Sequence, residues 1–500
     1  MTLGDVAEVV GVEASTFVHL VAPTPVTAIA YDSRSVRPGA VFVALRGQKA
    51  DGASFAAQAI ARGAITVIAE TPSPATVTVP WMQVRDARLS LALLADRFFG
   101  SPSRRMPVVG VTGTNGKTTT SYLLAAVLDA AGLSAGVMGT VSYRVGRVER
   151  EASRTTPEAP DVQQLLAEML EQGCRSAVME VSSHALALKR VDGMRFAAAV
   201  FTNLTRDHLD FHEDMEQYFA AKRRLFQMLE PGVAGVVNAD DPRATSLLAV
   251  CPRAITYGIT QIAHVAPGPF ALDIGGLTLD VRTPKGSVAV RSSLVGRPNV
   301  YNILAATATA VALDLPLEAV SRGVHALSGV PGRFEVVSDT GDDVTVVVDY
   351  AHTDDALRNL LETARPLAPQ RLVTVFGCGG DRDTTKRPLM GMVAARLSDV
   401  VIVTSDNPRS EDPARILDDI RRGITPASHA GRHVDVMSIV DRGEAIDHAV
   451  SQARSGDLVL VAGKGHEKYQ QIGDRVLPFD DVAVARAALG RRRAKQTRAV

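Results

Sequence analysis

The stretch that decides the fold reads Val108-Val109-Gly110-Val111-Thr112-Gly113-Thr114-Asn115-Gly116-Lys117-Thr118-Thr119. It begins as a short apolar strand, continues as a glycine-rich turn, and leads into a helix expected from Thr119 to about Ala131. A strand, a glycine loop, Lys-Thr and a helix in this order bind phosphate, because backbone N–H groups and the helix N-terminus attract anionic oxygens. Lys117 is expected to reach the β and γ phosphates of ATP, and the Thr118 hydroxyl is expected to ligate Mg²⁺.

The loop departs from the general phosphate-loop pattern at one position. The pattern has glycine five residues before Gly116, where this chain has Val111, so Gly113 supplies the turn. A tight strand–helix turn without a ligand is the alternative interpretation, which the combination of strand, Lys-Thr and helix disfavours. The loop residues expected to bind the nucleotide are Gly113, Thr114, Asn115, Gly116, Lys117, Thr118 and Thr119.

The composition excludes several classes of function. With 54 basic and 54 acidic residues, the chain carries a formal net charge of +0, which argues against nucleic acid as the main partner. Its three cysteines have neither metal-ligand spacing nor a disulfide framework, which favours a reducing compartment. We find no signal peptide and no apolar run of the ~20 residues that a membrane span needs. We therefore expect a cytoplasmic, monomeric enzyme that acts on small molecules.

Outward from the loop, the chain divides into three blocks of α/β pattern. The boundaries fall in the turn-rich stretch 100–105 and near Arg333, which gives blocks of residues 1–105, 106–332 and 333–500. Short buried strands separated by helix patterns predict mostly parallel sheets. Residues 251–298 predict a small β-rich excursion. The third block has strand patterns at 344–348, 372–376, 400–403 and 458–461.

Polar residues follow the strands at the ends where ligands gather in such sheets. Glu180 ends one buried strand of the second block, and residues 202–210 follow another. Taken singly, these side chains are more often helix caps or ion-pair partners, but their shared position favours a site. In the third block, the four loops at 349–352, 377–382, 406–409 and 463–467 are expected to meet at one sheet edge. Four charged loops together favour a binding site over plain turns.

Six motifs in order along the chain resemble those of the Mur ligases, and more narrowly of the members that add diaminopimelate. They are Gly113–Thr118, Glu180-Val181-Ser182-Ser183-His184, Arg206-Asp207-His208-Leu209-Asp210, Asn299 with Asn302, Gly332-Arg333-Phe334-Glu335 and Asp349-Tyr350-Ala351-His352. The resemblance covers essentially the whole chain. It implies three domains: an N-terminal domain for the UDP end of the substrate, a central ATPase and a Rossmann-like C-terminal domain.

The resemblance also implies the reaction. An ATP- and Mg²⁺-dependent ligase of this kind adds meso-diaminopimelate to the peptidoglycan precursor UDP-MurNAc-L-Ala-D-Glu through an acyl phosphate. The implied catalytic residues are Lys117, Glu180, His208 and Lys222, and the implied magnesium residues are Thr118, Glu180, His208 and Lys222. Asn302, Arg333 and Asp349 complete the nucleotide set. The precursor set is Tyr31, Ser33, Gln48, Lys49, Ala50, Thr155, Thr156, Ser182 and Arg190, and Leu188 stands where the family often has glutamine.

Lys222 lies in a helical run and, without the resemblance, would be interpreted as a solvated lysine. In similar enzymes the matching lysine is carbamylated, which turns a cation into a carboxylate-like group. A neutral amine is needed for that reaction, so the site is expected to lower the lysine pKa through burial or nearby cations.

The loop Asp406-Asn407-Pro408-Arg409 resembles that of the diaminopimelate-adding enzymes. Arginine suits the additional carboxylate of diaminopimelate, because its planar fork pairs bidentately. By the same resemblance, Arg382, Gly463 and Glu467 complete the amino-acid set with Asp406, Asn407, Pro408 and Arg409. The alternative is that Arg409 only braces its loop by pairing with Glu411 or Asp412.

Two other functions stay open at this point. One is a phosphate-loop switch that hydrolyses nucleotide only to change shape, although the chain has no recognisable guanine-reading motif. The other is folylpolyglutamate synthetase, which shares the ATPase plan. The stretch Tyr31-Asp32-Ser33-Arg34 and the Arg409 loop favour the peptidoglycan enzyme.

Overall fold

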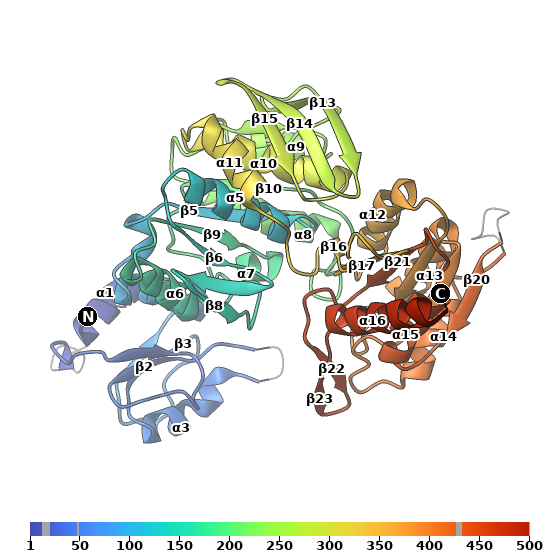
Figure 1. The fold of residues 1–500 in the computed structure, drawn as a ribbon. Coiled ribbons are helices and arrows are strands. Elements are labelled where there is room, and N and C mark those ends of the chain that lie inside the picture. Colours follow the sequence, from blue (N-terminus) through green and yellow to red (C-terminus); the bar gives the residue numbers. More distant parts are fainter. Residues whose placement is uncertain (13–20, 48–49, 427–432, 500) are drawn as a thin grey trace.

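The computed structural model describes residues 1–12, 21–47, 50–426 and 433–499. Three α/β domains follow one another along the chain, and each is built on a mostly parallel sheet of its own (Figure 1). The expected fold class is therefore confirmed. Gln48 and Lys49 of the expected precursor set lie outside the described residues.

The first domain has a four-stranded parallel sheet in the order β1-β2-β3-β4. Its elements are α1 (Leu3–Val10), β1 (Ala28–Ala30), β2 (Ala40–Val43), η1 (Gly52–Phe55), α3 (Ala56–Ala61), β3 (Ala64–Ala69), β4 (Trp81–Gln83), α4 (Ala87–Phe98) and η2 (Pro102–Arg104). The apolar run of β2 is wholly buried because helices cover both faces of the sheet.

The central domain has an eight-stranded sheet in the order β12-β11-β10-β5-β9-β6-β7-β8, antiparallel only at β7 and β8. Its strands are β5 (Val108–Thr112), β6 (Ala135–Met138), β7 (Ser142–Val145), β8 (Val148–Glu151), β9 (Ser176–Glu180), β10 (Ala198–Phe201), β11 (Gly235–Asn238) and β12 (Ile255–Tyr257). Its helices are α5 (Lys117–Ala130), α6 (Ala159–Glu171), α7 (Ser183–Ala187), α8 (Met215–Gln227), α9 (Ala244–Leu248), α10 (Arg297–Ala312) and α11 (Leu317–Ala326).

The expected β-rich excursion is an antiparallel ribbon of β13 (Ala266–Asp273), β14 (Gly276–Thr283) and β15 (Gly286–Ser292). It packs with α5, α10 and α11 into one apolar cluster on one face of the central sheet. Helix α5 begins at Lys117, two residues before the expected start. The reason is Gly116, whose φ of 85° ends the turn directly before the helix, so that Lys117 is its first residue.

The third domain has a six-stranded sheet in the order β16-β17-β21-β18-β19-β20, with only β16 antiparallel. Its strands are β16 (Glu335–Val336), β17 (Thr345–Asp349), β18 (Leu372–Phe376), β19 (Val400–Val403), β20 (Asp435–Ser438), β21 (Leu458–Ala462) and the hairpin β22 (Tyr469–Ile472) with β23 (Arg475–Pro478). Its helices are α12 (Asp354–Ala364), η3 (Arg365–Leu367), α13 (Lys386–Leu397), α14 (Pro413–Arg421), α15 (Arg442–Gln452) and α16 (Asp481–Ala499).

Strand β21 shows why this sheet is buried on both faces. Leu458, Leu460 and Ala462 pack with α12, α13 and α14, whereas Val459 and Val461 pack with α15 and α16. Successive side chains of a strand point to opposite faces, so the unbroken apolar run fills two cores at once. Because β17, β21, β18 and β19 run parallel, the loops that follow them leave the sheet at one edge.

No helix among the described residues has both the length and the apolar character that crossing a bilayer requires.

Candidate active site

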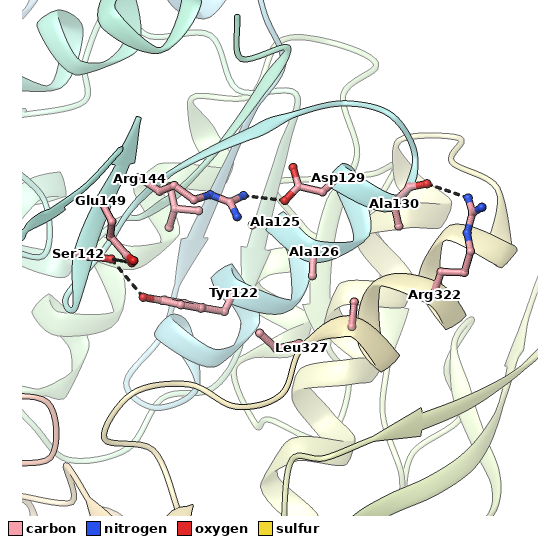
Figure 2. Close-up of a pocket in the computed structure, with 12 residues that line it drawn as sticks. Tyr122, Ala125, Ala126, Asp129, Ala130, Ser142, Arg144, Glu149, Arg322 and Leu327 are labelled. Atoms are coloured by element: carbon pink, nitrogen blue, oxygen red, sulfur yellow. Dashed lines mark hydrogen bonds and ion pairs between the residues drawn. The ribbon is translucent and has the colours of Figure 1, made fainter. Parts of the chain in front are cut away.

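Two cavities flank helix α5, and their chemistry differs. The first, of about 510 Å³, lies between α5, the β7–β8 hairpin and α11 (Figure 2). Its polar groups bond to one another: Arg144 donates to Asp129 at 2.9 Å, and Arg322 donates to the carbonyl of Ala130 at 2.8 Å. The Ser142 hydroxyl donates to Glu149. These contacts join the hairpin and α11 to α5, and none of the motif residues lines this cavity.

The second cavity, of about 690 Å³, gathers the sequence motifs. It lies where the central domain meets the third domain, at the carboxyl ends of β5, β9 and β10. Residues of the expected sets that line it are Thr114, Asn115, Gly116, Lys117, Thr118, Thr119, Thr155, Glu180, Ser182, His208, Lys222, Asn302, Arg333 and Asp349. This cavity is therefore the candidate active site.

The segment that follows β10 lies very close to the phosphate loop and holds it in place. At Gly113, whose φ is 147°, a Cβ atom would lie 1.8 Å from the Thr202 hydroxyl oxygen. At Gly116 it would lie 2.6 Å from Oδ1 of Asn302. The Asn203 side-chain oxygen accepts from the backbone N–H of Asn115 at 2.9 Å. Only glycine fits at the two positions, which is the physical basis of the motif.

Two buried lysines meet at the loop. Nζ of Lys117 donates to the carbonyls of Gly113 and Thr114 at 3.0 and 2.8 Å, and Nζ of Lys222 donates to the same Gly113 carbonyl at 2.6 Å. Burial lowers the pKa of Lys117, and burial together with the Lys117 charge lowers the pKa of Lys222 well below its ordinary value. The expected environment of Lys222 is therefore present.

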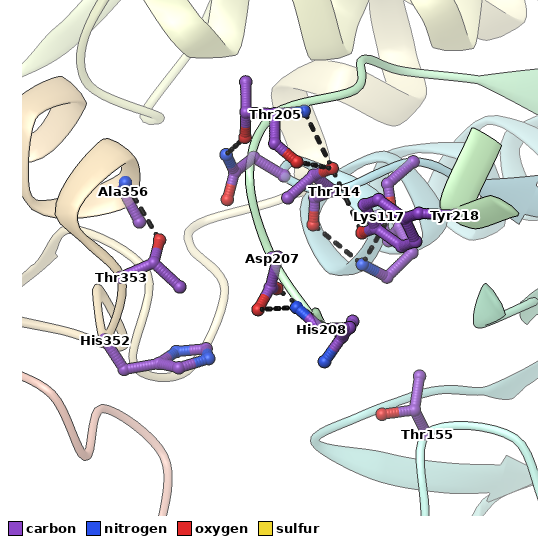
Figure 3. A network of polar contacts seen from close by, with 12 residues as sticks. Thr114, Lys117, Thr155, Thr205, Asp207, His208, Tyr218, His352, Thr353 and Ala356 are labelled. Atoms are coloured by element: carbon purple, nitrogen blue, oxygen red, sulfur yellow. Dashed lines mark hydrogen bonds and ion pairs between the residues drawn. The ribbon is translucent and has the colours of Figure 1, made fainter. Parts of the chain in front are cut away.

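Asp207 and His208 lie between the phosphate loop and the third domain (Figure 3). Burial and the neighbouring cations lower the pKa of His208 to about 3 against the opposing effect of Asp207, so the imidazole is neutral at pH 7. Burial raises the pKa of Asp207, but His208, His352 and Lys117 outweigh it, and the net shift is downward. A carboxylate thus faces Lys117 from the side of the third domain.

Oxygen atoms suited to bind a hard metal ion lie on the opposite side of the loop. Glu180 is 1% exposed, and its carboxylate accepts from the backbone N–H of Thr140 at 2.8 Å and from the Thr140 hydroxyl at 3.0 Å. The Thr118 hydroxyl accepts from Arg333 at 3.2 Å. A carboxylate and a hydroxyl at a phosphate loop fit a magnesium ion that also binds phosphate oxygens. Among the described residues, no three His, Cys, Asp or Glu side chains form a metal cluster.

The third domain supplies the other wall of the cavity. The guanidinium of Arg333 lies 4.6 Å from the ring centroid of Tyr350. Asp349 accepts from the backbone N–H groups of Phe334 at 2.7 Å and Ala351 at 2.8 Å, and burial raises its pKa. Asp349 therefore holds the loop that carries Arg333 through two backbone hydrogen bonds.

Direct contacts join the two domains at the cavity. The Asn115 amide donates to Asp355 of α12 at 3.1 Å, and Arg206 donates to the Thr385 hydroxyl at 2.6 Å. At Gly296, a Cβ atom would lie 2.2 Å from the Thr363 side chain. The walls of the cavity are consequently set by how the third domain packs against the central one.

The precursor set is divided between two places. Thr155 and Ser182 line the cavity, while Thr156 donates to the Glu180 carbonyl at 2.8 Å and Arg190 pairs with Glu158 at 2.7 Å. The first-domain residues of the set lie apart from it. The Tyr31 hydroxyl donates to Asp161 of α6 at 2.7 Å, the Ser33 hydroxyl donates to Gln58 at 2.8 Å, and Ala50 is exposed. Leu188 is the residue that ends α7.

The amino-acid set forms a second cluster at the carboxyl ends of β18, β19 and β21. Asn407 donates to Glu467 at 2.9 Å, and a Cβ atom at Gly463 would lie 2.7 Å from Asp406. Arg409 donates to the Gly380 carbonyl at 2.6 Å, and Glu411 bonds instead to Arg387 at 2.8 Å. The expected alternative partners of Arg409, Glu411 and Asp412, are thus not the ones it contacts. Arg382 is exposed on the neighbouring loop.

The two clusters are connected. The rings of Tyr350 and His466 lie 4.8 Å apart, and His466 lies near the backbone of Thr140, which holds Glu180. Left-handed φ values at non-glycine residues recur here, at His208 (54°), Phe334 (43°), Asp381 (53°) and Arg409 (52°). Such values cost about 1–3 kcal/mol each and mark functional loops.

Some residues at the site were not singled out from the sequence. Asp207 and Tyr350 belong to quoted motifs but received no role, although their places after strands offered a signal. Lys464 lies between Gly463 and Glu467 and was passed over. Thr140 and Asp355 carry no motif signal, because only tertiary packing brings them to Glu180 and Asn115.

Comparisons with known proteins agree along the chain. Three family models match it: the Mur ligase middle domain at residues 111–310, the Mur ligase glutamate ligase domain at 332–465 and the Mur ligase family catalytic domain at 25–99. The chain is 50% identical over 473 residues to the UDP-N-acetylmuramoyl-L-alanyl-D-glutamate–2,6-diaminopimelate ligase of Solibacter usitatus, covering 94% of each chain. It is 48% identical to the enzyme of that name from Gloeobacter violaceus, covering 94% of this chain and 95% of the relative. A solved structure with the same enzyme name has a TM-score of 0.69 at 35% identity and covers 99% of each chain.

An imidazole cluster beside Lys222 makes the stability of the protein sensitive to acid. His212 is 4% exposed, its ring lies 5.2 Å from that of Tyr218, and its Nε2 has no hydrogen-bond partner among the described residues. Burial, with His184 and Lys222 nearby, lowers the pKa of His212 to about 4. In the unfolded chain this histidine has an ordinary pKa of about 6.5. Between about pH 6.5 and pH 4, the unfolded chain therefore binds a proton at His212 that the folded chain does not bind.

We therefore predict that the wild type loses unfolding free energy as the pH falls from about 6.5 to about 4, and that His212→Phe loses roughly 2 kcal/mol less. Urea denaturation across this range, followed by circular dichroism, measures the difference. His433→Phe is the control, because the side chain of His433 is 90% exposed. Parallel pH profiles for the wild type and His212→Phe contradict the prediction.

Proposed function

The chain belongs to the Mur ligase family, and on that premise we propose that it joins 2,6-diaminopimelate, as the meso isomer, to UDP-MurNAc-L-Ala-D-Glu at the expense of ATP. It is an ATP-dependent ligase of peptidoglycan precursor synthesis. One observation carries the proposal. In a single cavity, the phosphate loop faces Glu180 of its own domain and Arg333 of the third domain, and a cluster suited to an amino acid lies beside it.

The chemistry proceeds in two steps. A carboxylate oxygen of the precursor attacks the γ-phosphorus, the bond to the bridging oxygen breaks, and ADP leaves. The amine of diaminopimelate then attacks the acyl phosphate, a proton leaves the nitrogen, and inorganic phosphate departs as the amide forms. Two anions must be brought together in the first step, so cationic groups and positioning supply most of the rate.

The chain's own residues provide these effects. Lys117 lies within the loop, and its ammonium transfers from loop carbonyls to phosphate oxygens with a small side-chain movement. Arg333 approaches from the third domain, so its charge reaches the phosphates only when the two domains pack as they do here. Neutral His208 adds polar contact without adding charge. The backbone N–H groups of Gly116, Lys117 and Thr118, at the N-terminus of α5, orient the phosphate chain.

Mg²⁺ fits the same place. Thr118 and Glu180 would hold it as oxygen donors, with His208 and a modified Lys222 beside them. Bound with ATP, the ion offsets charge on the phosphates.

In this proposal, each of the three domains binds a different substrate. Residues 1–105 receive the UDP end, residues 106–332 bind ATP and activate the precursor, and residues 333–500 present the amino acid. Tyr31 and Ser33 belong to the first task, and Thr155, Thr156, Ser182 and Arg190 guide the peptide toward the cavity. Folylpolyglutamate synthetase and a nucleotide switch are the weaker alternatives, because the similarity to diaminopimelate ligases extends over 94% of the chain.

The reaction itself gives the first test. Sustained ADP formation over many turnovers is expected only when Mg-ATP, UDP-MurNAc-L-Ala-D-Glu and meso-diaminopimelate are all present, as followed by a coupled ADP assay. Lys117→Ala is expected to lower kcat at least 100-fold, because it removes the charge beside the transferring phosphoryl group. Lys285→Ala, which removes an exposed lysine from the turn between β14 and β15, is the control. Rapid ADP release with neither the precursor nor the amino acid present supports a switch instead.

We further propose that Lys222 carries a carbamate. Its amine is buried and its pKa is lowered, so a neutral nitrogen is available to attack carbon dioxide, losing one proton as the carbamate forms. With ¹³C-bicarbonate, the wild type is expected to show a carbamate carbonyl signal in ¹³C NMR that Lys222→Ala lacks. The variant is expected to lose most of its activity while still binding ADP. An active Lys222→Ala enzyme refutes the proposal.

Arg409 is proposed to select diaminopimelate over L-lysine. Its guanidinium is placed at a loop bordered by Gly380, and the distal carboxylate of diaminopimelate supplies the matching anion. Arg409→Ala is expected to lower kcat/KM for diaminopimelate on the order of 100-fold and to change that for L-lysine little. Arg415→Ala, on the nearby α14, is the control. Equal use of both amino acids by the wild type, or an unchanged preference in Arg409→Ala, contradicts this role.

A further inference from the structure

A buried lysine lies among the residues of the amino-acid cluster. The side chain of Lys464 is 0% exposed, and it lies on the loop that follows β21. Its Nζ donates to Oδ1 of Asn407 at 3.1 Å and to Oε2 of Glu467 at 3.0 Å. Nζ also lies 4.0 Å from Oδ1 of Asp406 and 5.3 Å from the ring centroid of Tyr469. A charge buried this completely needs such partners, since burial of an unpaired ammonium is strongly unfavourable.

Another cation, Arg442, joins the loop that follows β21 to the loop that follows β19. Arg442 is fully buried and forms a bidentate pair with Asp481 at 2.7 Å for both bonds. It also donates to the carbonyl of Ala462 at 3.0 Å, at the end of β21, and to that of Ser405 at 3.3 Å, on the loop that follows β19. The backbone framework is thus joined through Arg442. Lys464, by contrast, directs its hydrogen bonds to side chains.

Those side chains are arranged as one unit. Oδ1 of Asn407 accepts from Lys464 and from the backbone N–H of Gln471 at 2.9 Å, which leaves its amide nitrogen to donate to Oε2 of Glu467 at 2.9 Å. Both hydrogen bonds that the described residues give the Glu467 carboxylate end on Oε2, and its side chain is 20% exposed. The carboxylate is therefore fixed through one oxygen while the other is left to accept from a ligand.

The formal charges of this unit also match a ligand. Asp406 and Glu467 carry two negative charges, Lys464 carries one positive charge, and the Arg442–Asp481 pair is neutral. One negative charge is left unbalanced in a largely buried place. An ammonium group of an incoming amino acid matches it, and Arg409 on the same loop matches a carboxylate.

We propose that Lys464 is a positioning residue of the amino-acid site, which orients Asn407 and Glu467 and leaves one net negative charge for the substrate ammonium. This inference rests on the proposed function, because it concerns the amino acid that the ligase adds. Lys464 acts through its two partners and does not touch the reacting atoms.

The test separates amino-acid binding from the rest of the reaction. Lys464→Met keeps a long unbranched side chain without the charge, and it is expected to raise KM for meso-diaminopimelate about 10-fold to 100-fold. KM for ATP and for the UDP precursor, and kcat at saturating amino acid, are expected to change less than about 3-fold. Lys468→Met is the matched control, because that side chain is 57% exposed and pairs with Asp480.

A double-mutant cycle tests the route of the effect. If Lys464 acts through Glu467, then Lys464→Met adds little to the KM increase already caused by Glu467→Gln. The double variant also removes both charges of the pair, so it folds even if the single variant, with its unbalanced carboxylate, does not. Full multiplication of the two effects, or an unchanged KM in Lys464→Met, overturns the inference. A wild type that forms no ADP with diaminopimelate overturns the proposed function instead.

Discussion

The Nζ atoms of Lys117 and Lys222 both donate to one carbonyl oxygen, that of Gly113, and the rest of the site is arranged around this contact. Burial lowers the pKa values of both lysines, and the charge of Lys117 lowers that of Lys222 further. The Gly113 carbonyl and the Asp207 carboxylate offset part of the repulsion. A place built in this way favours anions, and ATP together with a substrate carboxylate are both anions.

The same contact depends on the fold around it. Gly113 must lie flat against the segment after β10, because a Cβ atom would overlap the Thr202 hydroxyl. Lys222 reaches the carbonyl from α8, a helix that begins more than a hundred residues along the chain from the loop. The sheet order places β10 directly beside β5, so both segments leave the sheet at the same edge.

In the function that we propose, the division between domains separates activation of the precursor from recognition of the amino acid. The nucleotide cavity takes residues from two domains, whereas the amino-acid cluster belongs to the third domain alone. Tyr350 and His466 connect the two places, and His466 reaches Thr140 beside Glu180. In the function that we propose, an amine held at the second cluster is in this way presented to the carboxylate that is activated at the first.

Local patterns in the sequence determined the parts of this protein that depend on neighbours along the chain. The phosphate loop needs glycine at positions 113 and 116 because both have positive φ values, and the unbroken apolar strands of the third domain need cover on both faces, so both were predictable. The strand ends carrying Glu180 and Asp349 were predictable for the same reason. Only the tertiary structure decided that Asp349 organises the Arg333 loop, that Arg409 contacts Gly380 and not Glu411, and that Lys464 supports Asn407 and Glu467. These contacts join segments whose separation along the chain carries no signal, because hydrogen bonds and buried charges are satisfied by whatever lies near in space.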